Sequence, residues 1–281
     1  MIRRLLNKLK SLFVSPNSNV RIAIVWQAKW TAYLNQTVAF YRTLNESDKA
    51  LFEKRVRLFL EMTPVEAGQF EVTDEDRLLV AASAVIPVWG FPEWHYFNVE
   101  KVFLLPASFN EQFECGQPDS LITGMVGTGP MSGKLALSQP ALHLGFSNTK
   151  DKQNVGIHEF VHLVDMADGD CDGFPERLKK YAFSIPWFEL VENKITGIES
   201  NNSNIRDYGA TNKAEFLAVT SEYFFERPKM MQKKHPKLYQ VLSDFYQQDV
   251  SRIADDIKPR KKAPCPCGSG KRYKHCCMPE S

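Results

Sequence analysis

The chain lacks an apolar run long enough to cross a membrane. Its longest nearly apolar run, residues 78–91, is interrupted by Pro87, whereas a spanning helix needs roughly 20 apolar residues. The N-terminal residues 1–14 are basic and amphipathic, but Lys8 and Lys10 interrupt the apolar core that a secretory signal peptide requires. These absences predict a cytoplasmic protein without a membrane span. Contact between the N-terminal segment and an acidic membrane surface stays open as an alternative to a packed or frayed helix.

The chain also lacks a dominant charge and a disulfide framework. Its 35 Lys and Arg residues against 33 Asp and Glu give a net charge of +2, so the overall charge implies no nucleic-acid or other electrostatic partner. Of the 6 cysteines, Cys115 and Cys171 lie far apart and carry no motif, and nothing indicates an oxidising compartment. With 281 residues, 43% of them hydrophobic, the chain can bury a large core.

One short motif, His158-Glu159-Phe160-Val161-His162, has the pattern H-E-x-x-H. On a helix, residues four apart lie on one face, so the two imidazoles can bind one Zn²⁺ at about 2.0–2.1 Å each. The glutamate between them points about a quarter turn away, toward a water that it could deprotonate. The motif predicts the zinc site of a metallopeptidase.

The segment around the motif, Asn154 to Met166, predicts a buried helix. It contains no proline and is apolar on most sides, as buried helices are. Buried histidine and glutamate side chains must be paired or bound to a metal, which argues against a purely structural role. Asp165 shares the face of the two histidines. It could hold a ligand histidine by its second ring nitrogen, or accept hydrogen bonds from the loop that follows.

A third zinc ligand must come from another part of the chain, because a catalytic zinc takes three protein ligands and leaves one position open. Residues 212–227 predict a second helix, capped by Thr211 or Asn212 and ended by the proline that follows. Its two acidic candidates, Glu215 and Glu222, are seven residues apart and share a face. Spacing alone does not choose between them, and either could be a solvated helix glutamate.

Long segments of the chain resemble the Mlc titration factor A family of zinc-dependent peptidases. The resemblance is carried, in chain order, by TDEDRLLVAASAVIPVWG, KVFLLPASF, HEFVHLVDMADG, DYGATNKAEFLAVTSEYFFERP and LYQVLSDFYQQD. It covers nearly all of residues 25–250. The family implies a fold related to the gluzincin metallopeptidases, peptidase activity, and binding of the transcriptional repressor Mlc.

The same resemblance implies roles for individual residues. His158, His162 and Glu215 would be the zinc ligands, and Glu159 would be the general base. Tyr208, in the polar turn before the second helix, would donate a hydrogen bond to the developing oxyanion.

A second cluster of chemistry-bearing residues lies at the other end of the chain, where residues 265–277 read CPCGSGKRYKHCC. Four thiolates can form a closed tetrahedral zinc site, and the glycines allow so short a loop to close. The segment is similar to the SEC-C motif. The resemblance implies as ligands Cys265, Cys267, Cys276 and Cys277. His275 could replace one of the last two, and a disulfide pair is the alternative to a metal site.

The cysteine-rich tail is basic. Residues 258–274 contain seven Lys or Arg and no Asp or Glu, so the tail stays positive even after about two charges are subtracted for a Zn(Cys)₄ centre. It could dock on an acidic protein, on a ribosomal partner or on nucleic acid, or it could be a solvated linker.

The predicted organisation is α+β: a mainly helical gluzincin-like domain with a small sheet, followed by a short zinc-binding tail. We assign residues 1–24 to the basic N-terminal segment, 25–250 to the peptidase domain, 251–264 to a linker and 265–278 to the SEC-C motif. Helices are expected at 28–44 and 46–60, with a third opened by a capping-box-like start at 73–76.

Two strands are expected, at 101–105 and 134–138, with a loop or hairpin between 123 and 133. We expect Lys134 to Ser138 to be the edge strand that binds substrate backbone. Residues 168–173 resemble the start of a calcium loop, but Lys179 stands where a bidentate glutamate is needed, so a tight polar turn is predicted.

The sequence therefore predicts a zinc-dependent peptidase, with aminopeptidase-like cleavage among its possible modes, one catalytic zinc and one structural zinc. The alternative is a non-catalytic protein that sequesters a transcriptional repressor and docks partners through its tail. The two hypotheses differ at Glu159, because turnover needs a general base and a binding scaffold does not.

Overall fold

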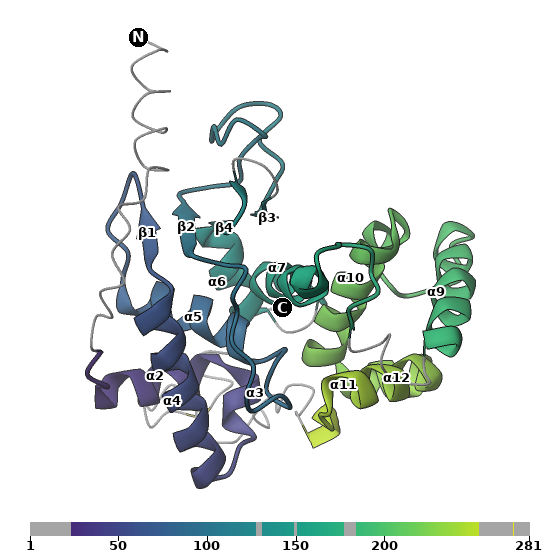
Figure 1. Ribbon diagram of the computed structural model, residues 1–281, viewed down its shortest axis with the longest axis horizontal. Helices are drawn as coiled ribbons and strands as arrows, with labels where there is room; N and C mark the ends of the chain where they lie inside the picture. Colours follow the sequence, from purple (N-terminus) through teal and green to yellow (C-terminus); the bar gives the residue numbers. More distant parts are fainter. Residues whose placement is uncertain (1–23, 128–130, 149–150, 177–183, 253–271, 273–281) are drawn as a thin grey trace.

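The computed structural model describes residues 24–127, 131–148, 151–176, 184–252 and 272 (Figure 1). Residues 1–23 of the basic N-terminal segment and the four tail cysteines lie outside the described residues. The described part is mainly helical and contains a small mixed sheet. The α+β class expected from the sequence is confirmed. None of the helices in the described ranges is long and apolar enough to cross a bilayer.

The first helices form one side of the molecule. α2 (Ala28–Thr37) and α3 (Ala39–Arg42) replace the single expected helix at 28–44, because the backbone of Val38 is extended and its side chain is fully buried. α4 (Glu46–Met62) begins at its N-cap Asn45. α5 (Asp74–Val85) begins with the predicted capping box, in which Thr73 and Asp76 exchange hydrogen bonds.

Four short strands form the sheet in the order β1-β2-β4-β3. Their bounds are Val65–Ala67 for β1, Lys101–Leu105 for β2, Gly124–Val126 for β3 and Lys134–Ser138 for β4. β1, β2 and β4 are parallel, and β3 is antiparallel to β4. β2 and β4 match their predicted bounds. The prediction that β4 is the edge strand is wrong, because β3 lies outside it in the sheet.

The remaining helices carry the candidate site. Their bounds are Gln139–Ser147 for α6, Val155–Asp165 for α7, Ser184–Glu199 for α9, Lys213–Glu226 for α10, Pro228–Lys234 for α11 and Pro236–Tyr246 for α12. Short 3₁₀ turns accompany these helices: η2 (Met166–Asp168) follows α7, η3 (Asp207–Ala210) precedes α10, and η4 (Val250–Arg252) follows α12. α7 lies centrally, between the sheet with its flanking helices and α10 (Figure 1).

α7 is buried along its whole length from Gly156 to Asp165. Its first turn approaches α5 very closely: a Cβ on Gly156 would lie 2.1 Å from Ser83 Oγ, which only glycine avoids. One large apolar cluster surrounds the helix and includes side chains of α4, α5, α10 and α12. The motif-bearing helix is therefore fixed by core packing, which holds its polar side chains in place.

Candidate metal centre and active site

Two capped helices bring the candidate ligands together. The side chain of Asn154 accepts the Ile157 N–H at 3.1 Å and starts α7. The side chain of Asn212 accepts the Glu215 N–H at 2.9 Å and starts α10. The cap at Asn212 is one of the two that the sequence offered, the other being Thr211. α7 and α10 pack against each other, so Glu215 lies opposite the histidine face of α7.

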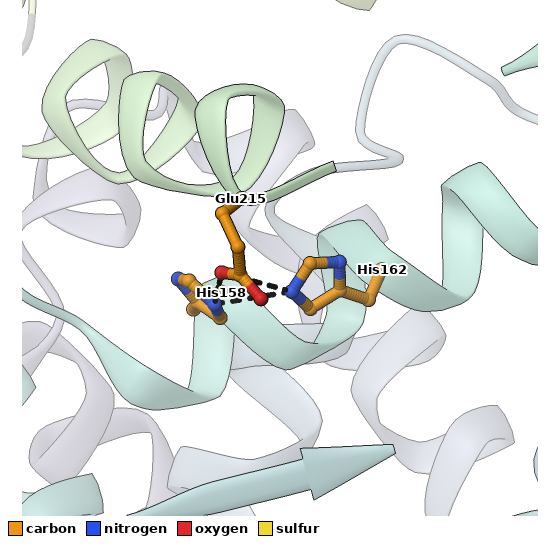
Figure 2. A group of neighbouring side chains, drawn as sticks. All are labelled: His158, His162 and Glu215. Carbon is orange, nitrogen blue, oxygen red and sulfur yellow. Dashed lines mark hydrogen bonds and ion pairs between the residues drawn. The ribbon is translucent and has the colours of Figure 1, made fainter. Parts of the chain in front are cut away.

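His158, His162 and Glu215 converge on one point (Figure 2). Glu215 Oε2 lies 3.0 Å from His158 Nε2 and 3.5 Å from His162 Nε2. The two Nε2 atoms are 3.1 Å apart. Of the two glutamates that the sequence left open, the structure brings Glu215 to the Nε2 side of both imidazoles.

The three ligand atoms fit a zinc ion. Tetrahedral zinc with bonds of 2.0–2.1 Å places its ligand atoms roughly 3.3 Å apart, which lies within the observed spread. Glu215 Oε2 is buried beside the two imidazole Nε2 atoms, so all three atoms can serve as ligands of one metal ion. Burial would raise the pKa of Glu215, but the two histidines outweigh it and hold that pKa well below its usual range. The carboxylate is therefore charged and available to a cation.

Glu222 lies on the other side of His158. Its Oε1 accepts from His158 Nδ1 at 2.8 Å, and its Oε2 accepts the Asn154 backbone N–H at 2.5 Å. Arg206 also contacts Oε1, and Glu222 is almost completely buried. A carboxylate at the second nitrogen of a ligand histidine fixes the orientation and tautomer of the ring. The sequence predicted no such role for Glu222 and missed Arg206, although Arg206 directly precedes the segment DYGATN.

The C-terminal end of α7 is held by the turn that follows it. Asp165 Oδ2 accepts the Gly173 N–H at 2.8 Å, which is the loop contact that the sequence offered as one alternative. The neighbour of His162 Nδ1 is instead Cys171 Sγ, at 3.6 Å. Cys171 carried no sequence signal, because it belongs to no motif and reaches His162 only through the turn at 168–173.

Glu159 lies beside the free edge of the sheet. Its side chain is buried, and burial raises the pKa of its carboxyl group. A Cβ on Gly124 of β3 would lie 2.6 Å from Glu159 Oε1, so the strand passes the glutamate at a distance that only glycine permits. Glu159 thus lies between its own helix and the edge strand, where a buried carboxyl group holds a proton more readily than an exposed one does.

Tyr208 projects from η3 toward the candidate metal centre. Its ring centroid is 5.9 Å from that of His158, and its side chain is half exposed. Partial burial, followed by the charges of Glu215 and Glu159, raises the pKa of the phenol to about 12. The hydroxyl therefore stays protonated at neutral pH and can donate a hydrogen bond.

Comparison with known proteins finds relatives of most of the chain. An uncharacterized protein of Synechocystis, slr2042, is 29% identical over 77% of this chain and 82% of its own length. The Mlc titration factor A of Serratia proteamaculans is 32% identical over 69% of this chain and 78% of its own length. That of Salmonella arizonae is 32% identical over a shorter stretch, 35% of this chain and 42% of its own length.

Two family profiles match separate parts of the chain. The SEC-C motif matches residues 262–279, the basic cysteine-rich tail. The glucose-regulated metallo-peptidase M90 family matches residues 19–247, which include the H-E-x-x-H helix, η3 and α10. The chain therefore belongs to the glucose-regulated metallo-peptidase M90 family and ends in a SEC-C motif.

Proposed function

We propose that the chain is a zinc-dependent peptidase whose catalytic zinc is held by His158, His162 and Glu215. The convergence of two Nε2 atoms and one buried carboxylate oxygen on a single point carries the proposal. Zinc in such a site supplies a Lewis acid and lowers the pKa of water toward neutrality. The fold would then be of the gluzincin type, in which the third ligand comes from a second helix.

Within this proposal, three side chains beside the zinc site have roles in the reaction. Glu159 accepts the proton of the attacking water and passes it to the leaving amine. Tyr208 donates a hydrogen bond to the oxygen of the scissile carbonyl as negative charge develops there. Glu222, held by Arg206 and by the Asn154 N–H, keeps the His158 ring in the orientation that presents Nε2.

The substrate backbone would pair with β3. Ser138 N–H donates to the Thr123 carbonyl at 2.7 Å, and Gly124 lies opposite Leu137. Because antiparallel pairing alternates, the N–H and C=O groups of Gly124 and Val126 are directed away from β4, along the free edge beside Glu159. An extended peptide could therefore add to this edge as a further strand. This assigns to β3 the role that the sequence gave to β4.

The test is a hydrolysis screen of purified zinc-loaded protein against internally quenched peptides and aminoacyl reporters. We expect cleavage of at least one class, loss of cleavage after chelation, and recovery when zinc is restored. Absence of hydrolysis from the zinc-loaded protein, or cleavage that chelation leaves unchanged, would contradict the proposal. Comparison of the two reporter classes also distinguishes internal cleavage from aminopeptidase-like cleavage.

A second candidate function comes from the name of two relatives, Mlc titration factor A. On this hypothesis the chain binds and sequesters a transcriptional repressor of the Mlc type. Binding needs a surface and not a general base, so Glu159→Gln should leave repressor binding unchanged in a calorimetric titration. A protein that binds the repressor but cleaves no peptide would favour this function over the first.

The SEC-C tail would be a separate docking module held together by its own zinc. A segment this short has no hydrophobic core, so its fold must come from metal binding at the four cysteines. Deleting residues 258–281 is expected to remove one zinc per chain and to leave cleavage of small peptides nearly unchanged. Metal analysis and peptide assays measure both effects.

Loss of the tail should also weaken binding to a protein or ribosomal partner. The seven basic residues at 258–274 would supply much of the attraction, so binding by the intact chain should fall as salt is added. If the truncated protein unfolds or loses small-peptide activity, the tail is part of the catalytic domain and the docking proposal fails.

A further inference from the structure

Glu226, the last residue of α10, is a buried carboxyl group beside the side-chain amide of Asn154. Its residue exposure is 7%, and neither carboxyl oxygen makes a hydrogen bond of standard geometry. The groups that act on it come from several elements: Glu222 on its own helix, Asp151 and Asn154 before α7, and Arg206 before η3. Two of these are acidic, and the Asn154 amide and Arg206 offset them only in part. The carboxyl group is therefore protonated at neutral pH, and its ionised form would need a counter-charge that these neighbours supply only in part.

The carboxylate lies in the wall of a small cavity on the side of α7 that faces α3 and α6. The volume of the cavity is about 40 Å³, enough for roughly three water-sized groups. Most of its wall is apolar, formed by Val38, Phe40, Ile86, Phe146, Ile157 and Phe225. Asn154 completes the polar part beside Glu226, and the exposed Arg42 and half-buried Ala39 mark its outer side.

The chemistry of this wall selects one class of ligand. A carboxylate at the negative end of a helix dipole favours a positive charge, and aromatic neighbours tolerate cations better than aliphatic ones do. Calcium and magnesium need six or more oxygen ligands or retained waters, which one carboxylate in an apolar cavity does not supply. The volume excludes bulky organic cations. An ammonium ion or a short primary amine meets all of these conditions.

We propose that this cavity is a binding site for a small ammonium-type cation, which forms a salt bridge with Glu226. Asn154 connects the cavity to the candidate zinc site, because its side chain lines the cavity and its backbone N–H donates to Glu222 beside His158. A cation bound in the cavity would therefore also restrict the motion of Asn154 and, through Glu222, of the His158 ring. The binding itself does not depend on peptidase activity, so failure of one proposal leaves the other intact.

Protons compete with the ligand. Burial, followed by the charges of Glu222 and Asp151, raises the pKa of Glu226 to about 9. A cation binds the ionised form and must displace this proton, so apparent affinity should rise from pH 7 toward pH 9. Above that range the free amine replaces the ammonium ion, and binding should fall again.

The experiment is thermal unfolding of the full-length zinc-loaded protein at pH 8.5 in ammonium or methylammonium chloride. Sodium chloride and tetramethylammonium chloride at equal ionic strength are the reference salts. At about 100 times its dissociation constant, a single ligand should raise Tm by about 5 °C or more above both references. Calorimetric titration with methylammonium should give one site per chain.

Three variants make the result specific. Glu226→Gln keeps the shape but removes the charge, and should abolish both the Tm rise and the titration signal. Ala39→Leu should block the cavity while leaving Glu226 in place, so it guards against a folding defect in the first variant. Glu199→Gln, an exposed glutamate on α9, should behave as wild type. Equal stabilisation by sodium, or an undiminished response in Glu226→Gln and Ala39→Leu, would overturn the proposal.

Discussion

Replacing Glu159 by glutamine is expected to reduce peptide hydrolysis by about 10²–10⁴-fold while the protein keeps its zinc. A general base contributes roughly this factor, and glutamine cannot accept a proton. The substitution preserves the size of a side chain confined beside Gly124, and Glu159 is not among the three residues that converge on the candidate metal position. The measurement is kcat with the peptide that wild-type protein cleaves best, together with zinc content per chain.

Two controls separate this effect from a folding defect. Glu159→Gln should unfold at or above the wild-type temperature, because a neutral amide is easier to bury than a carboxylate. Tyr208→Phe should lower kcat to a smaller extent and leave zinc content unchanged, since it removes one hydrogen bond to the oxyanion. Activity of Glu159→Gln within a factor of two of wild type would reject the mechanism.

Local signals in the sequence predict most of the elements that position the site. Thr73 and Asn212 are side-chain caps, and each starts the helix that its residue type and context predict. The bounds of β2 and β4 follow from short apolar runs ended by turn residues. These features depend on a few neighbouring residues, so they can be inferred without the fold.

The features that the sequence did not predict depend on contacts between distant segments. The helix is interrupted between α2 and α3 because Val38 is extended and buried in the core. Helix propensities do not predict this interruption. β3 is only three residues long. The glycine-rich sequence around it predicts a loop or hairpin but does not show that β3 pairs with the outer side of β4. The same holds for the contacts of Cys171 and Arg206, whose partners are on other elements.

Glu215 and Glu222 show this limit at the site itself. They are two turns apart on one face of α10, so helical periodicity treats them alike. Only the packing of α10 across α7 places one on the Nε2 side of His158 and the other on its Nδ1 side. Substitution of the two glutamates should therefore affect zinc binding in different ways.

Glu215→Ala is expected to remove the catalytic zinc, and Glu222→Gln to retain it with lower affinity. Loss of one of three protein ligands leaves two histidines, too few for a stable catalytic site. Loss of the charge beside His158 Nδ1 weakens the orientation of a ligand, which typically costs about 10–100-fold in metal affinity. Glutamine is chosen at position 222 because alanine would leave the Asn154 N–H and Arg206 without an acceptor in a buried place.

The measurement is zinc per chain after dialysis, followed by competition with a chelator of known affinity. In the full chain, Glu215→Ala should contain one zinc fewer than wild type, and in the protein lacking residues 258–281 it should contain none. Glu222→Gln should match wild type in both backgrounds at saturating zinc and lose its metal to the chelator first. If Glu222→Gln is metal-free at saturation while Glu215→Ala retains zinc, the two glutamates have exchanged roles, and the proposed ligand set is wrong.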